Sequence, residues 1–384
     1  MRYPLILLAL FSLCLFSRTH AYYIASGFPK PAVPQYTTFY KKNAQGLLNI
    51  STGVCNASLH DYHAAFTAPA DSTLAHQLLA ICYTHEKCIL DNLTADIMAN
   101  LNSAIVILGL MPTLLSTIGP SVADISLLSA HRPLLAFLIS LGAPAVWPTR
   151  LFEHSDPVRV LGSSAGSSTR GILLVVHVSA RWAWMARPLS AVQYLLAAGA
   201  AANVVTTSVE LGRNSILSWG CTTTFGPLLW TTLASVVHVV AAVSFALAQR
   251  SAARQRSDGV GRGLVQQRSD NSNAARGGPK LFARWLWGTV QREVTLCAEQ
   301  EVEEYDVDAK VPFFAVLGNV IAGCLGFVHI IFGIIIFSSL QLVSVWDVMN
   351  FILWRYVIST VVCRLILVVE IGGLRRSNGT EKSS

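Results

Sequence analysis

The chain is poor in charge. Only 13% of its 384 residues are Asp, Glu, Lys or Arg, whereas 53% are hydrophobic. A soluble globular chain carries about 25% charged residues. This shortage excludes a set of water-soluble domains, and the apolar excess excludes a disordered chain. Together they indicate a multi-pass membrane protein, an all-α polytopic helix bundle.

Several kinds of chemistry also lack their residues. No Asp or Glu lies in the middle of an apolar run, which argues against a carboxylate proton relay, and no run carries a lysine that could hold a retinal. There is no phosphate-binding glycine loop and no zinc-protease motif. Gly162–Gly166 matches G-x-S-x-G but lacks the strand and helix of a hydrolase elbow. We therefore expect no enzyme activity, no cofactor and no metal site.

The N-terminal residues have the layout of a cleavable signal peptide. Arg2 precedes an apolar run over Leu5–Phe16, and Ser17–Ala21 supplies small residues before a cut. A run of 12 residues is too short to cross about 30 Å of hydrocarbon. We expect residues 1–21 to be removed and the mature N-terminus to face the lumen or the cell exterior.

Residues 22–100 are polar and are expected to form a small glycosylated ectodomain. Three Asn-X-Ser/Thr acceptors fall here, at Asn49, Asn56 and Asn92. Prolines punctuate residues 22–70 and predict irregular structure there. From Asp71 the pattern becomes helical, with a helix that can continue into the first span.

Five apolar runs are long enough to cross a membrane. They are Leu101–Ile118, Ser190–Val209, Phe225–Leu247, Phe313–Phe337 and Val348–Val369. Two weaker stretches, Pro133–Val146 and Gly171–Met185, would raise the count to seven if both crossed. We expect five spans across residues 101–248 and 311–370, with the weaker stretches re-entrant or interfacial within 119–189. Seven spans are the alternative.

The basic residues give the orientation, because Lys and Arg collect on the cytoplasmic side. Ten of them lie in residues 249–310, six in 119–189 and three in the tail 371–384. An external N-terminus and a cytoplasmic C-terminus place all three groups inside. The net charge of +7 is therefore a gradient across a plasma membrane or endomembrane. It indicates a lipid bilayer as the partner and no nucleic acid.

Four cysteines are expected on the lumenal side. Cys55, Cys82 and Cys88 lie in the ectodomain, and Cys221 lies in the loop between the second and third spans. Four cysteines in an oxidising compartment can pair in three ways. On one continuous helix Cys82 and Cys88 would be about 9 Å apart along the axis, beyond the reach of a disulfide. We then expect one of them to pair with Cys221 and the other with Cys55.

The cytoplasmic loop 249–310 has three parts. Residues 250–279 are rich in Arg, Ser, Gly and Gln, which predicts disorder. An amphipathic helix rich in Trp follows Pro279, and it would lie in the membrane interface or pack on the bundle. Glu293–Asp308 holds seven acidic residues and no basic one. This run is either solvated or a docking site for a protein partner.

Polar side chains inside spans are costly and are candidates for function. His238, His329 and Arg355 are the deepest. They would either pair with residues of other spans or line a path for an ion or substrate. Arg355 in particular needs a partner on another span.

Gly119–Val146 resembles a segment of uncharacterised multi-pass membrane proteins of filamentous fungi. That resemblance implies a fungal surface or endomembrane protein, and it implies no activity, cofactor or site. The sequence as a whole predicts a non-enzymatic sensor or scaffold. The alternative is a transporter or channel that uses the intramembrane histidines and Arg355.

Overall fold

The computed structural model describes residues 33–146, 183–261, 292–297 and 312–381, and it is a helix bundle. Five of the described helices are long and apolar enough to cross a membrane, and they coincide with the five apolar runs expected from the sequence. They are α6 (Ala95–Ile118), α11 (Ala183–Asn214), α12 (Gly226–Gly261), α14 (Phe313–Ser338) and the run from α15 (Val345–Asp347) through a π-helix (Val348–Leu353) into α16 (Trp354–Glu381).

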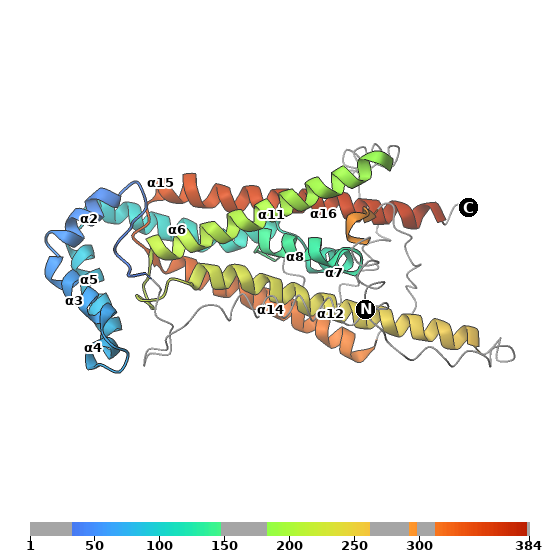
Figure 1. Cartoon of the computed structure of the whole chain (residues 1–384), viewed down its shortest axis with the longest axis horizontal. Helices are drawn as coiled ribbons and strands as arrows, with labels where there is room; N and C mark the ends of the chain where they lie inside the picture. Colours follow the sequence, from blue (N-terminus) through green and yellow to red (C-terminus); the bar gives the residue numbers. More distant parts are fainter. Residues whose placement is uncertain (1–32, 147–182, 262–291, 298–311, 382–384) are drawn as a thin grey trace.

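The molecule is elongated, with four short helices gathered at one end (Figure 1). These helices are α2 (Ala44–Thr52), α3 (Asn56–Thr67), α4 (Thr73–His76) and α5 (Leu78–Asp91). Two further short helices, α7 (Val122–His131) and α8 (Pro133–Gly142), lie towards the opposite end. Tryptophans and phenylalanines on the outside of the spans remain exposed, which suits a surface that contacts lipid.

Helix α8 covers most of the first weak stretch, Pro133–Val146, and α7 directly precedes it. Each has ten residues, which is too short to span a bilayer. Ser121 caps α7 by accepting the backbone N–H of Asp124, and Pro133 opens α8 at a position where no N–H is needed. Pro133–Gly142 is thus a short packed helix and not a sixth span. Most of the second stretch, Gly171–Met185, lies outside the described residues.

The expectation of irregular structure in residues 22–70 was wrong for 44–52 and 56–67, which form α2 and α3. Burial against α5 stabilises both helices, because isolated helices of nine and twelve residues are marginal in water. Leu47, Tyr62 and Leu78 are fully buried in this core. A single helix from Asp71 into the first span is also not formed, since α5 ends at Asp91 and α6 begins at Ala95.

The core of the N-terminal helices includes residues from loops of the membrane bundle. Ile216, Cys221 and Leu342 pack into it. Strands β1 (Ile216–Leu217) and β2 (Leu340–Gln341) pair antiparallel, with Ile216 opposite Gln341 and Leu217 opposite Leu340. This small sheet joins the loop after α11 to the loop after α14. The N-terminal helices therefore pack against the loops that connect the spans.

Two helices extend beyond their expected ends. Helix α12 continues to Gly261, so the disorder predicted over 250–279 is wrong for its first twelve residues. Helix α16 continues to Glu381 through the segment expected to be a tail. Residues 262–291, with most of the predicted amphipathic helix, lie outside the described residues.

Candidate functional site

Two disulfides lie in the N-terminal region. Cys55 joins Cys88 with 5.9 Å between their Cα atoms, and Cys82 joins Cys221 at 6.0 Å. Cys82 and Cys88 lie on the unbroken helix α5, which keeps them from pairing with each other. The bond from Cys82 to Cys221 ties α5 to the loop between α11 and α12.

Tyr36 reinforces this covalent connection. Its hydroxyl donates to the backbone carbonyl of Cys82 at 3.1 Å and lies 3.2 Å from Sγ of Cys221. The ring is buried edge-on against Tyr62 and His85. Burial raises the pKa of the Tyr36 hydroxyl well above its ordinary value, so the group stays a neutral donor. The disulfide is thus enclosed by packed side chains.

His85 holds the hydroxyls of two predicted glycosylation motifs. The side chains of Asn49, Asn56 and Asn92 are all exposed. The serine hydroxyls that complete the first two motifs, by contrast, are hydrogen-bonded within the protein. Ser51 Oγ lies 3.0 Å from Nε2 of His85, and Ser58 Oγ lies 2.8 Å from Nδ1 of the same ring. Burial lowers the pKa of His85 to about 4, so the ring is neutral at pH 7.

We expect Asn49 and Asn56 to accept glycans only before this region folds, because the hydroxyl of the motif is then free. Asn92 differs, since Thr94 is exposed. Folded, unmodified chain treated with oligosaccharyltransferase should gain a glycan at Asn92 faster than at the other two sites. Reduced and denatured chain should accept glycans at all three, and mass spectrometry reads each site. Equal rates on the folded chain would contradict a role for His85.

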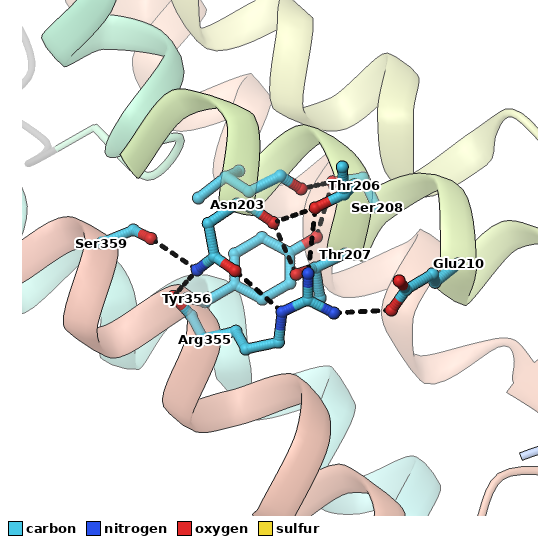
Figure 2. A network of polar contacts seen from close by, with 9 residues as sticks. Asn203, Thr206, Thr207, Ser208, Glu210, Arg355, Tyr356 and Ser359 are labelled. Atoms are coloured by element: carbon cyan, nitrogen blue, oxygen red, sulfur yellow. Dashed lines mark hydrogen bonds and ion pairs between the residues drawn. The ribbon is translucent and has the colours of Figure 1, made fainter. Parts of the chain in front are cut away.

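Arg355 has the partner on another span that the sequence required (Figure 2). Its guanidinium crosses from α16 to α11, where it donates to Asn203 Oδ1 at 2.8 Å and to Thr206 Oγ1 at 2.9 Å. It also forms an ion pair with Glu210 at 2.6 Å. These three partners lie on one face of α11, since residues three and seven apart share a side of a helix. In return, the side-chain amide of Asn203 donates a hydrogen bond to the backbone carbonyl of Arg355.

A second polar contact lies beside the first and joins three spans. Ser208 Oγ on α11 is 2.7 Å from the Tyr356 hydroxyl on α16 and 2.7 Å from Thr231 Oγ1 on α12. All three side chains are buried. Tyr40, from the segment before α2, packs into the same core. These buried hydroxyls satisfy one another's hydrogen-bonding capacity, as buried polar groups generally do.

His329 is held by a reciprocal contact between α12 and α14. Its Nε2 lies 2.8 Å from the backbone carbonyl of Trp230, and the indole N–H donates to the carbonyl of His329 at 3.1 Å. The two rings stack with centroids 5.2 Å apart. Gly333 leaves room for the indole, because a Cβ there would lie 2.3 Å from Nε1 of Trp230. In this arrangement His329 packs one helix on another.

Gly333→Ala is expected to lower the free energy of unfolding by about 1–3 kcal/mol, since the added methyl overlaps a buried indole. Gly199→Ala is the matched control, because a Cβ at Gly199 meets nothing within 4 Å. That change should be neutral or should stabilise the helix by up to about 1 kcal/mol. Thermal unfolding of the two variants in the same detergent compares them. Equal stabilities would contradict the close packing of Trp230.

His238 lies apart from the other two candidates. It is buried, and neither ring nitrogen has a hydrogen-bond partner among the described residues. It lines a cavity of about 20 Å³ with Ser129, Ser140 and Ser235, which is room for about one water molecule. Neither His329 nor Arg355 lines this cavity. The three intramembrane candidates therefore do not share one site.

Sequence reasoning did not predict an ion pair that is almost completely buried. Arg132, between α7 and α8, pairs with Glu370 of α16 at 2.9 Å, and their side chains are 0% and 1% exposed. Gln193 bridges them, accepting from Arg132 at 2.7 Å and donating to Glu370 at 2.6 Å. Ser190 takes another guanidinium N–H. In the sequence, only the position of Glu370 at the end of an apolar run indicates this pair, because its partner Arg132 lies 238 residues earlier.

The same cluster binds a short piece of the loop 249–310. Arg132 Nε donates to the backbone carbonyl of Glu293 at 3.0 Å, and the Glu293 carboxylate accepts from Tyr194 and from the backbone N–H of Leu134 at the start of α8. Glu370 accepts the backbone N–H of Cys297 at 3.1 Å. Burial raises the pKa of Glu293. Residues 292–297 are thereby fastened to α8, α11 and α16.

A further ion pair lies on the same half of α16. Arg364 contacts Asp124 of α7 at 3.0 Å, and its side chain is partly exposed. Within the described residues, no three His, Cys, Asp or Glu side chains are placed to hold a metal ion. The polar groups described here bind helices, loops and the N-terminal region to one another. Comparison with protein families, curated proteins and solved structures found no match.

Proposed function

We propose that this multi-pass membrane protein is a non-enzymatic sensor or scaffold of the secretory pathway or cell surface. Residues 22–100 would form its glycosylated ectodomain, and the loop 249–310 would meet a cytoplasmic partner. The observation that carries the proposal is the disulfide from Cys82 to Cys221, because it fastens the N-terminal helices to the loop that follows α11.

Helix α11 connects the two ends in this proposal. The loop after it holds Cys221, and its opposite end holds Ser190, Gln193 and Tyr194 in the cluster around Arg132. A displacement of the ectodomain would act on α11 through a covalent bond. The cluster at the other end forms hydrogen bonds with residues 292–297, which lie at the start of the acidic run Glu293–Asp308. A rigid helix with a site at each end is what a sensor needs for coupling.

Cys297 offers a natural reporter of such coupling. It is a free, buried thiol whose pKa burial raises well above its usual value, so it reacts slowly while the segment is docked. We expect Cys221→Ser to increase its labelling by maleimide about tenfold in the full chain with Cys324 and Cys363 replaced by serine. Labelling is measured on the Cys297 peptide by mass spectrometry, because each disulfide substitution also frees the thiol of the partner cysteine. Cys55→Ser is the control, since that disulfide joins α5 only to the residue before α3.

The two variants separate the outcomes. Faster labelling in Cys221→Ser than in Cys55→Ser supports transmission from the ectodomain to the loop. Equal acceleration would mean that the change is general loosening, and no acceleration would mean that the ends are independent. Either of the last two results would contradict the sensor hypothesis.

A transporter or channel is the second candidate, and His238 is the observation that favours it. An imidazole that has no hydrogen-bond partner among the described residues and lies beside a small cavity can exchange hydrogen bonds with a passing solute. Flux into proteoliposomes that is lost in His238→Gln and kept in His329→Gln would support this candidate. No flux above that of empty vesicles would reject it.

A further inference from the structure

The ion pair between Arg355 and Glu210 lies on the outer surface of the bundle. The Arg355 side chain is 31% exposed and that of Glu210 is 53% exposed. The buried pair of Arg132 and Glu370 has no such exposure. The neighbours of Arg355 on α16, Trp354 and Ile358, are exposed apolar residues of the kind that contact lipid. Two charges of opposite sign thus lie beside a surface for acyl chains.

Both charged groups keep unused hydrogen-bonding capacity. A guanidinium has five N–H donors, and Arg355 uses three of them on Asn203, Thr206 and Glu210. Glu210 uses Oε2 for this pair, and its Oε1 has no partner among the described residues. The site therefore offers two donors to an anion and, beside them, one acceptor to a cation.

The position along α11 places these groups at the level of lipid headgroups. The apolar part of the helix, Arg187–Asn214, has 28 residues and is about 42 Å long. A hydrocarbon core of about 30 Å leaves roughly one turn outside at each end. Glu210 lies four residues before Asn214, at about that boundary. The guanidinium of Arg355 reaches towards the same end of α11 through Thr206 and Glu210.

We propose that Arg355 and Glu210 form a binding site for the headgroup of phosphatidylethanolamine in the leaflet on the ectodomain side. The free N–H groups of Arg355 donate to the phosphate, and Oε1 of Glu210 accepts from the ammonium. The acyl chains then lie against the apolar surface beside Trp354 and Ile358. This proposal is independent of whether the protein is a sensor or a transporter.

The charges explain why the ligand is zwitterionic. A purely anionic headgroup would meet the carboxylate of Glu210, and a cation alone would meet the guanidinium. A headgroup with both charges meets a complementary group at each end. The ammonium of phosphatidylethanolamine donates hydrogen bonds, whereas the choline of phosphatidylcholine has no N–H. The acceptor on Glu210 therefore selects the former.

Native mass spectrometry of the full chain in mild detergent tests this site. The chain is mixed with equal amounts of phosphatidylethanolamine, phosphatidylcholine and phosphatidylglycerol, and the retained lipids are counted. We expect phosphatidylethanolamine to be retained about tenfold over phosphatidylcholine, the ratio that one hydrogen bond to a charged group supplies. Glu210→Gln keeps an oxygen for Arg355 but loses the charge, and it should abolish the preference.

Two variants control for general effects. Asp96→Asn makes the same kind of charge change at the exposed start of α6, and Arg364→Met breaks the other surface ion pair of α16. Both should keep the preference, whereas Arg355→Met should lose it. Retention of the three lipids in their mixing ratio would overturn the proposal. A dimer that dissociates in Glu210→Gln would also overturn it and would assign the surface to a second copy of the chain.

Discussion

Arg132→Met is expected to lower the free energy of unfolding by about 3–5 kcal/mol, because it leaves the carboxylate of Glu370 buried without a counter-charge. The substitution removes four polar contacts that join α8, α11, α16 and residues 292–297. Methionine fills a similar length, so loss of volume is a small part of the effect. Unfolding in a mixed-micelle denaturant series measures the change.

Two companion variants show that charge is the cause. Replacing Glu370 as well, in an Arg132→Met and Glu370→Leu double variant, should recover much of the lost stability, since the carboxylate left without its ion-pair partner is removed. Arg364→Met should cost about 1 kcal/mol or less, because its ion pair is partly exposed. A double variant no more stable than Arg132→Met would contradict the electrostatic explanation.

Cys221→Ser is expected to cost about 2–5 kcal/mol and to free the N-terminal helices from the bundle. The bond closes a loop with a sequence separation of 139, against 33 for the bond from Cys55 to Cys88. Loss of the longer closure should cost more stability, because the unfolded chain regains more freedom.

Limited proteolysis distinguishes the two disulfides further. In Cys221→Ser, cleavage between α5 and α6, around Leu93, should become faster while α2–α5 stay intact. In Cys55→Ser, cleavage should appear within α2 and α3 instead. The same cleavage pattern for both variants would contradict the view that one bond anchors the region and the other stabilises its interior.

The spans could be predicted from the sequence because their signal is local. An apolar run such as Phe313–Phe337 needs only its own length and composition to be identified, and α14 occupies almost the same residues. Local geometry also excluded a bond between Cys82 and Cys88, since both lie on α5, but it left open which of them pairs with Cys221. Arg355 was expected to need a partner on another span for the same reason, namely the cost of a charge in lipid.

The partners themselves are tertiary and leave little local trace. Nothing near Arg132 in the sequence indicates that it pairs with Glu370. Glu293 is one of seven acidic residues in its run, and the sequence does not distinguish it from the other six. Helices α2 and α3 were not predicted because they are short and their core is completed by α5, far along the chain. The unusual burial of Tyr36 and Tyr40 likewise depends on loops far away in the sequence.

Labelling of a tag at Ser164 tests the five-span topology most directly. Ser164 lies outside the described residues, between the short helix α8 and the second span. With five crossings it shares a side with the C-terminal tail, so an impermeant reagent should label both only after the membrane is opened. Labelling of Ser164 on intact cells, with the C-terminal tail still protected, would contradict five crossings and require seven.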